Sequence, residues 1–285
     1  MAPKTMEPIA RALWFIETRF KHDLSLEAVA NHCGLSRFYL TRAFCAVTGQ
    51  SVMRYIRSRR LTEAAHVLVN SSDDILSIAL AVGYGSHEAF TRAFRGEFGC
   101  TPESVRQNKN SLSDLALTES YRLESDFKIP IDPPRIIEKK TFCVAGIGGP
   151  YSLTTDHGIP ALWQEFVPYI GHVQGQVGTA TYGVCNNYDG SGNFDYIAGV
   201  EVSDTKGLPK ELQVLPIPTK TYAVFTHGDH VSTIRNTIYS IWGSWLPQSP
   251  FKTANSPDFE IYGDKFNGLT GEGEFEIWIP ILPAS

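Results

Sequence analysis

The chain has 285 residues, of which 42% are hydrophobic and 19% are charged, a globular composition long enough for two folded domains. No apolar run approaches the roughly 18 residues of a membrane-spanning helix, and the first residues lack a signal peptide's apolar stretch, so we expect a cytoplasmic protein without membrane contact. The net charge of −5 is uneven, with a balance of +4 in residues 1–109 and −9 in residues 110–285, which favours contact of the first part with a polyanion.

The five cysteines are scattered and never form a C-x-x-C pair. This pattern is typical of free thiols and not of a disulfide framework or a zinc site. The sequence also lacks a phosphate-binding glycine loop and a Ser/His/Asp arrangement with recognisable spacing. We therefore expect no cofactor, no metal site and no enzymatic activity.

Helical periodicity runs through residues 1–108, beginning with an amphipathic helix from about residue 8 to residue 20. Two helix-turn-helix motifs follow, one with its turn at Gly34 and one with its turn at Gly83. The phrase Thr-Arg-Ala-Phe occurs in the second helix of each motif, at residues 41–44 and again at residues 91–94. The repeated phrase predicts two copies of one structural unit, joined by a longer helix.

In a helix-turn-helix, the second helix enters the major groove of DNA and its outward side chains reach base edges. The Ala-Phe pair of each copy is expected to face the core, which leaves other positions outward. An arginine that pairs with guanine O6 and N7 contributes roughly 1–3 kcal/mol of discrimination. The predicted DNA-binding residues are Ser36, Arg37, Phe38, Thr41 and Arg42 in the first copy, and His87, Glu88, Thr91, Arg92 and Arg95 in the second.

Simpler alternatives exist for the charged residues. Arg42 and Arg92 could be ordinary solvated charges, although finding an arginine at the same place in both copies disfavours this. The connecting helix carries arginines at positions 54, 57, 59 and 60, and phosphate contact and plain solvent exposure fit them equally well. Glu88 fits either the reading of a cytosine or a second helix that relies mainly on phosphates.

The segments "LSLEAVANHCGLSRFYLTRAF" and "ILSIALAVGYGSHEAFTRAFRGEFGCTPESVR" resemble the DNA-binding domain of AraC/XylS-type transcription regulators. The resemblance implies a bacterial regulator, an activator or a repressor, that binds a bipartite promoter site in double-stranded DNA and works with RNA polymerase. A DNA-binding domain at the start of the chain is similar to the arrangement in the right-origin-binding-protein subgroup. Because one chain carries two reading helices, a monomer could cover such a site.

Residues 109–134 lack periodicity and are rich in Ser, Asp and Pro, which is typical of a linker. Residues 135–285 contain alternating aromatic and β-branched residues that predict strands. The order strand, helix, strand, strand occurs twice, and the phrases "KTFCVAG" and "KTYAVFT" open the two copies. We therefore expect a multidomain chain, with an all-α double helix-turn-helix domain at 1–108 followed by an α+β domain whose antiparallel sheet carries two helices on one face.

The phrases "FEIYG" and "EFEIWIPI", in this element order, resemble the GyrI-like effector-binding domain over about residues 135–282. The resemblance implies a cleft for small amphipathic, often cationic, molecules, and it places Glu276 at the position of a cleft glutamate. Strand alternation puts Glu276 beside Trp278, and a carboxylate beside an indole suits a cation. The predicted ligand-binding residues are Glu276, Trp278, Trp163, Tyr182, Trp242, Trp245 and Tyr262.

Three alternatives remain open for this second domain. The aromatic residues could belong to the core, with Glu276 facing solvent. Some GyrI-like domains are hydrolases, and Glu274, Glu276 and Asp195 are acids at strand positions. The domain could also be a protein-interaction module that binds no small molecule.

Overall fold

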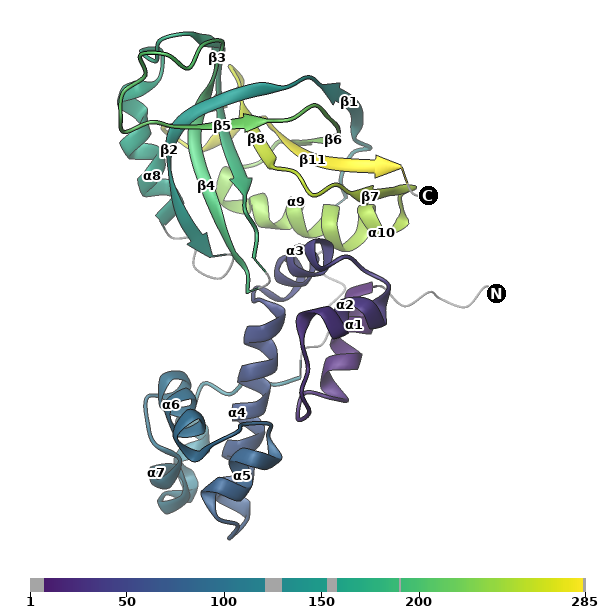
Figure 1. The fold of residues 1–285 in the computed structure, drawn as a ribbon, viewed down its shortest axis with the longest axis vertical. Helices are drawn as coiled ribbons and strands as arrows, with labels where there is room; N and C mark the ends of the chain where they lie inside the picture. The colour runs from purple at the N-terminus through teal and green to yellow at the C-terminus, as the bar shows by residue number, and fades with distance from the viewer. Residues whose placement is uncertain (1–7, 121–129, 153–157, 190, 284–285) are drawn as a thin grey trace. The chain divides into compact units, whose positions relative to one another are not determined.

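The computed structural model describes residues 8–120, 130–152, 158–189 and 191–283. The chain divides into two compact units, with residues 1–40 and 50–123 in unit 1 and residues 41–49 and 124–285 in unit 2. Figure 1 shows helices alone in the first part of the chain and a curled sheet with flanking helices in the second part. The predicted fold class, all-α followed by α+β with an antiparallel sheet, is confirmed.

The first part of the chain forms seven α-helices and a 3-10 helix within the described residues. They are α1 (Pro8–Glu17), α2 (Leu26–Cys33), α3 (Arg37–Thr48), α4 (Val52–Asn70), α5 (Ile75–Ala81), α6 (His87–Phe98), α7 (Pro102–Gln107) and η1 (Lys109–Asp114). Helix α3 is continuous, but its residues from Thr41 onward are grouped with unit 2.

The two helix-turn-helix motifs are α2–α3 and α5–α6. The turn glycines Gly34 and Gly83 have φ angles of 68° and 85°, in the left-handed region that is costly for a residue with a Cβ atom. The second helix of each motif begins at a serine whose hydroxyl accepts a backbone N–H, Tyr39 to Ser36 at 3.1 Å and Ala89 to Ser86 at 3.2 Å. The turns and caps expected from the sequence are therefore present in both copies.

The second motif builds the hydrophobic core of unit 1 around Phe90 and Phe94, which are fully buried. Their ring centroids are 5.5 Å apart, and both pack with Leu61 of α4. Leucines 112, 115 and 117 also pack against this core. Residues 112–117, which we expected to form part of a linker, therefore extend unit 1.

Two arginines of α4 hold unit 1 together. Arg59 donates to both carboxylate oxygens of Glu17, at 2.9 and 3.0 Å, and to the carbonyl of Thr118 at 2.8 Å. Arg60 donates to the carbonyls of Phe20 and His22, each at 2.5 Å. Neither phosphate contact nor plain solvent exposure describes these two side chains, because backbone and carboxylate oxygens of unit 1 already accept their hydrogen bonds.

Unit 2 is built on a nine-stranded sheet in which all neighbouring strands are antiparallel, in the order β1-β6-β11-β8-β3-β4-β2-β5 with β7 also paired to β11. The strands are β1 (Arg135–Lys139), β2 (Phe142–Ser152), β3 (Gln176–Asn186), β4 (Asn193–Val202), β5 (Gln213–Ile217), β6 (Lys220–His227), β7 (Phe251–Thr253), β8 (Asp258–Tyr262) and β11 (Phe275–Pro283). A separate two-stranded sheet pairs β9 (Phe266–Asn267) with β10 (Glu272–Gly273).

The strand order contains two similar halves that meet at the β3–β8 pair. One half is β2-β4-β3 and the other is β6-β11-β8. The repeated phrases open β2 and β6, and a helix follows each of them, α8 (Ile159–Phe166) after β2 and α9 (Ile234–Ser240) after β6. The internal repeat seen in the sequence thus becomes an approximate twofold arrangement of the sheet.

The helices of unit 2 cover one face of the sheet. Helix α8 packs against β2 and β4 and buries Leu162 and Phe166 there, and the 3-10 turn η4 (Val167–Tyr169) continues it. A 3-10 turn, η5 (Val231–Thr233), precedes α9, which continues as a π-helical turn, η6 (Ile241–Trp245), and the short α10 (Leu246–Gln248).

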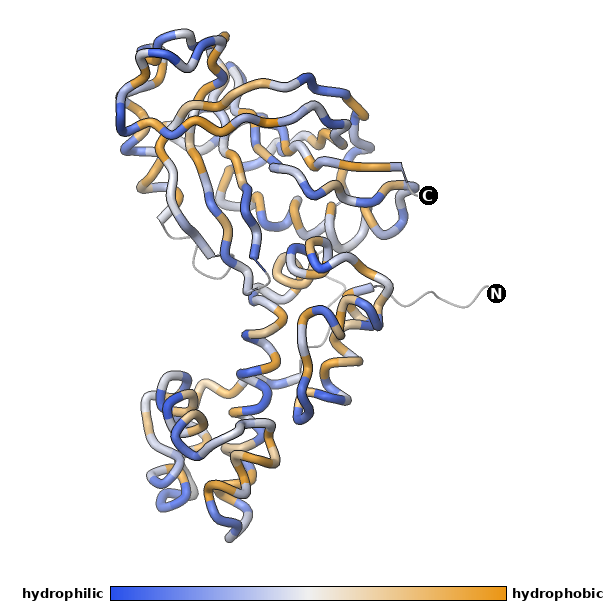
Figure 2. Tube along the Cα trace, viewed as in Figure 1, coloured by the Kyte–Doolittle hydropathy of each residue, from blue (hydrophilic) through white to orange (hydrophobic). Residues whose placement is uncertain are grey.

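The other face of the sheet has its own aromatic core, which includes Phe142, Tyr182, Tyr222, Phe259 and Trp278. Figure 2 shows hydrophobic residues recurring along the strands and helices, with hydrophilic residues at most turns. None of the helices in the described ranges has the length and apolar character needed to cross a bilayer.

The bonds of Arg59 predict a stability effect. We expect Arg59→Met to lower the free energy of unfolding by about 1–3 kcal/mol, because it leaves the half-buried Glu17 carboxylate without its charged donor. The measurement is urea denaturation followed by far-ultraviolet circular dichroism. Arg54→Met is the matched control, since Arg54 is exposed on the same helix and should change stability by less than about 0.5 kcal/mol. Equal losses for the two variants would contradict the assigned role.

Candidate functional site

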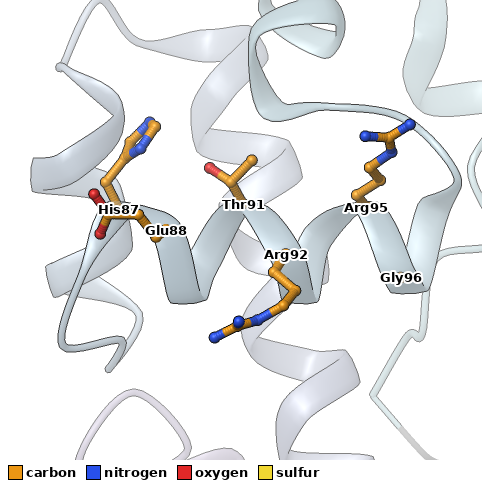
Figure 3. Close-up of a pocket in the computed structure, with 6 residues that line it drawn as sticks. All are labelled: His87, Glu88, Thr91, Arg92, Arg95 and Gly96. Carbon is orange, nitrogen blue, oxygen red and sulfur yellow. The ribbon is translucent and has the colours of Figure 1, made fainter.

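Helix α6 presents a polar face lined by His87, Glu88, Thr91, Arg92, Arg95 and Gly96, which border a shallow surface hollow. Figure 3 shows His87, Thr91 and Arg95 in a row along one side of the helix, while Arg92 extends from another side. The row follows from helical spacing, because residues four apart lie one above the other. The buried Phe90 and Phe94 anchor the opposite face of the helix in the core.

The side chains on this face differ in their partners. Glu88 accepts from its own backbone N–H and from the Ser86 hydroxyl, and these bonds lower the pKa of its carboxyl group. His87 lies 3.5 Å from a carboxylate oxygen of Glu103 on α7. Arg92 and Arg95 are exposed, and neither has an ion-pair or hydrogen-bond partner within the described part of the chain. Two cations are therefore available on the face of α6.

The corresponding residues on α3 are placed differently. Arg37 is exposed and Phe38 is half-buried, but Thr41 is only 2% exposed and Arg42 only 7%. The Arg42 guanidinium forms an ion pair with the Asp258 carboxylate, within unit 2. The expectation that Arg42 faces outward, as Arg92 does, is therefore corrected for this structure.

Unit 2 contains a cavity of about 590 Å³ at the pair of central strands β3 and β8. Helices α8 and α9 contribute Trp163 and Ile238, and β4 contributes Tyr196. Two carboxylates, Asp258 and Glu260, line it from β8. They are two residues apart and so share one face of the strand. The cavity thus combines apolar and aromatic walls with two acids, the composition expected of a small-molecule site.

Glu260 takes part in a chain of hydrogen bonds. The indole of Trp163 donates to the Tyr196 hydroxyl at 3.1 Å, and that hydroxyl donates to Glu260 at 3.2 Å. Gly183 lies opposite Glu260 in the β3–β8 register, and a Cβ atom at this position would collide with both the Tyr196 hydroxyl and the Glu260 carboxylate. The absence of a side chain at residue 183 therefore leaves the space that these two groups occupy.

Asp258 lies beside a guanidinium held against two rings. The Arg42 guanidinium carbon is 4.2 Å from the ring centroid of Tyr188 and 4.6 Å from that of Trp242. Burial is the largest influence and lowers the pKa of Arg42, but the Asp258 carboxylate, with smaller contributions from Tyr188 and Cys185, raises that pKa overall. The guanidinium is therefore charged in this position.

The carboxyl group of Glu260 is a weaker acid than that of an ordinary glutamate. Burial, followed by the negative charge of Asp258, raises its pKa from 4.5 to about 8, against smaller opposing effects of the Tyr196 hydrogen bond and the Arg42 charge. The same burial, with the Glu260 charge, raises the pKa of the Tyr196 and Tyr262 hydroxyls. Glu260 is thus largely protonated near neutral pH and can exchange its proton for a bound cation.

Comparison with known proteins shows which families the two parts of the chain match. The profile of the integron-associated effector binding protein family, Cass2, matches residues 135–281, and a helix-turn-helix domain profile matches residues 29–108. The transcriptional regulator Rob of Salmonella typhimurium is 25% identical over 272 residues, covering 91% of each chain. The multiple antibiotic resistance protein MarA of Salmonella typhimurium is 39% identical over 92 residues, 32% of this chain and 72% of that protein. An integron cassette protein structure from Vibrio cholerae covers 53% of this chain and 97% of its own, with 23% identity and a TM-score of 0.40.

The chain belongs to the AraC-type regulators that carry a Cass2 effector-binding domain. It is a DNA-binding transcription regulator with an effector-binding domain after the helix-turn-helix domain. The family resemblances inferred from the sequence are confirmed.

The cavity of unit 2 contains some of the predicted ligand-binding residues and not others. Trp163, Trp242 and Tyr262 line it. Four of the predicted residues do not: Glu276, Trp278, Tyr182 and Trp245. The predicted alternation along β11 is present, and the cavity lies on the face of Ile277 and Ile279, opposite the face of Glu276 and Trp278.

The excluded residues have other partners. The Trp278 ring stacks on Phe259 with centroids 5.4 Å apart, in the core of the opposite sheet face, and its indole donates to Glu276 at 2.9 Å. Glu276 also forms an ion pair with Arg135.

Tyr182 and Trp245, the other two residues outside the cavity lining, also contact other side chains. Tyr182 donates to Glu201 at 2.7 Å, and Trp245 packs edge-on against Phe225 with centroids 4.9 Å apart. The sequence signal for the acids that line the cavity was a pair of carboxylates alternating with Phe259 in the phrase "DFEIY".

The acids on which the hydrolase alternative depended are also engaged elsewhere. Glu274 pairs with Lys265 at 2.6 Å, and Asp195 accepts from Asn187 at 2.7 Å. Neither of them, nor Glu276, lines the cavity. In the described ranges no three His, Cys, Asp or Glu side chains gather in a way that could hold a metal ion.

The raised pKa of Glu260 predicts how the stability of this regulator depends on pH. Folded Glu260 keeps its proton up to about pH 8, whereas the unfolded residue loses it near 4.5, so the folded state binds more protons in between. Its contribution to the free energy of unfolding therefore falls as the pH rises from about 4.5 to about 8. Glu260→Gln should remove this contribution and flatten the pH dependence of the melting temperature across that window. An unchanged slope in the variant would show that Glu260 titrates normally.

Proposed function

We propose that this regulator reads double-stranded DNA with α6 and the start of α3, and that a lipophilic organic cation in the cavity is its effector. The observation that carries the effector proposal is Glu260, a carboxyl group with a raised pKa inside an aromatic-lined cavity. RNA polymerase as a partner, a cytoplasmic location and the absence of catalysis belong to the same proposal.

The exposed face of α6 supports the DNA part of the proposal. The side chains of Arg92 and Arg95 extend from the helix without partners among the described residues, and Thr91 lies in the same row as Arg95 in Figure 3. Arginines on a second helix can pair with guanine in the major groove, and they also neutralise phosphates. On α3, Ser36 and Arg37 precede the buried part of the helix and remain exposed.

This proposal predicts a change in base preference. A selection from random duplexes first supplies the binding site, and binding is then followed by fluorescence anisotropy. Arg92→Ala should weaken binding by about 1–3 kcal/mol and relax the preference at one base position. Arg57→Ala removes the same charge from an exposed position on α4, so it measures the loss that does not depend on sequence. If both variants lower the affinity equally for every duplex, α6 does not read bases.

The chemistry of the cavity supports an organic cation as the effector. A cation that enters the cavity promotes loss of the Glu260 proton, so the two charges neutralise each other away from water. Trp163 and Tyr262 pack edge to face, with centroids 5.3 Å apart, and offer π surfaces to such a cation. A small inorganic cation would leave the apolar walls unfilled, which favours a cation with aromatic or aliphatic substituents.

The effector proposal is tested with tetraphenylphosphonium as the probe, by titration calorimetry on the full chain. Glu260→Gln keeps the size of the side chain and should weaken binding by at least about tenfold, because it removes the balancing charge. Wild-type binding should strengthen as the pH rises through about 8, with proton release that depends on the buffer. Glu276→Gln is the matched control, since Glu276 lies on the opposite face of the sheet. If Glu276→Gln weakens binding and Glu260→Gln does not, the assigned cavity is wrong.

A further inference from the structure

The ion pair of Arg42 and Asp258 has the composition of a complete cation-binding site. A buried carboxylate faces the guanidinium, and the rings of Tyr188 and Trp242 lie within 4.2 and 4.6 Å of its central carbon. Acid and aromatic faces together are what a protein offers to a planar organic cation. Here the cation is supplied by the chain itself.

The backbone around this site is adapted to the arginine. Trp242 is part of the π-helical turn Ile241–Trp245, and π turns inside helices are frequent at functional sites. The next residue is Gly243, where a Cβ atom would lie 3.3 Å from a methyl group of Val47 on α3. A glycine at 243 therefore lets the α3 segment that carries Arg42 approach closely.

The second copy of the Thr-Arg-Ala-Phe phrase provides a comparison for the placement of Arg42. Arg92 stands at the same position of the second copy, is exposed and has no partner among the described residues. The local sequence thus allows an outward arginine, and the burial of Arg42 results from its contacts in unit 2. A guanidinium buried at 7% exposure is tolerated only because a carboxylate balances its charge.

We propose that Asp258, Tyr188 and Trp242 form a subsite for a planar cation, that Arg42 is its internal occupant, and that a guanidinium-like or amidinium-like effector competes with Arg42 for it. The inference rests on the proposed function, since it specifies the class of cation and how its binding is regulated. Asp258 and Glu260 line the same cavity as Arg42, so an effector can reach both acids. Only molecules in which Arg42 has left the subsite can bind the effector there. The apparent affinity is therefore the affinity of the empty subsite multiplied by the fraction of molecules in which it is empty.

Competition at this subsite couples the effector to DNA. Arg42 cannot contact a base while its guanidinium is buried against Asp258. An effector that takes its place releases Arg42, which is one of the predicted DNA-binding residues. By linkage, DNA that engages Arg42 must then strengthen effector binding by the same factor.

The test uses phenylguanidinium as the probe and phenylurea as its uncharged planar analogue, with the full chain and titration calorimetry. Arg42→Ala should bind phenylguanidinium at least about tenfold more tightly than the wild type, because the subsite is empty. Phenylurea should show no such gain. Adding Asp258→Asn to Arg42→Ala should abolish the gain, and Arg42→Lys, which keeps a cation opposite Asp258, should gain less than Arg42→Ala.

Two controls keep the result interpretable. Arg235→Ala removes another positive charge from the lining of the same cavity, so the gain for Arg42→Ala must exceed its effect. If Arg42→Ala melts at a lower temperature, phenylguanidinium should restore the melting temperature of that variant more than it raises that of the wild type. Equal affinities and equal melting shifts for the wild type and Arg42→Ala would overturn the proposal. Binding of tetraphenylphosphonium that depends on Glu260 would still stand in that case, so the two failures are distinguishable.

The DNA arm uses the selected duplex and fluorescence anisotropy. Saturating phenylguanidinium should tighten duplex binding by the wild type severalfold and should leave Arg42→Ala unchanged. The duplex should in turn increase the affinity of the wild type for phenylguanidinium. An equal response of both proteins would overturn the coupling between effector and DNA through Arg42.

Discussion

The antiparallel pairing of β3 with β8 is the constraint on which the candidate site depends. It joins the two halves of the sheet and places Gly183 opposite Glu260, so no side chain from β3 fills the space above the carboxylate. The hydroxyl of Tyr196, on the next strand, reaches that space and donates to Glu260. Each half of the sheet has its own helix, α8 or α9, and the cavity between them opens where the halves meet. The internal repeat of the sequence therefore produces the site as well as the sheet, because a duplicated unit creates a seam that neither unit has alone.

The electrostatics of the cavity follow from having two carboxyl groups two residues apart on one strand. Two negative charges at this separation in a poorly solvated space repel each other, and burial disfavours both. The structure resolves the conflict differently for each acid, since Asp258 is balanced by Arg42 while Glu260 holds its proton to about pH 8. The negative charge of Asp258 is one of the causes that raise the pKa of Glu260, so removing that charge should lower the pKa of Glu260. With Asp258 paired to Arg42 and Glu260 protonated, the two acids leave no unbalanced negative charge in the cavity, whose lining also carries Arg235. Under the proposed function, a cation that enters creates its own counter-charge when Glu260 releases its proton.

Much of the fold could be predicted from the sequence, because the signals were local. Turn glycines, serine caps and the repeated phrase identify the two helix-turn-helix motifs, and period-two alternation identifies the strands. Which face of β11 meets the ligand could not be predicted, since alternation divides Glu276 from Ile277 without saying which side is lined by helices. That choice depends on pairing between β11, β8 and β3, a long-range property. The roles of Arg59 and Arg60 were hidden for the same reason, as their acceptors, which include Glu17, Phe20 and Thr118, lie far from them in the sequence.

Arg42 and Arg92 show what a repeated phrase can and cannot predict about a side chain. Both arginines follow the same turn, occupy the same helical position and precede the same Ala-Phe pair, and both helices form as the sequence predicts. Yet Arg92 is exposed, while Arg42 pairs with an acid 216 residues further along the chain. Local sequence determines that a helix presents an arginine at that position, and it leaves open which acceptor the arginine meets, a phosphate, a base edge or a carboxylate. A planar, permanently charged side chain fits all of these partners, so the same phrase gives an exposed arginine in one copy and a buried ion pair in the other.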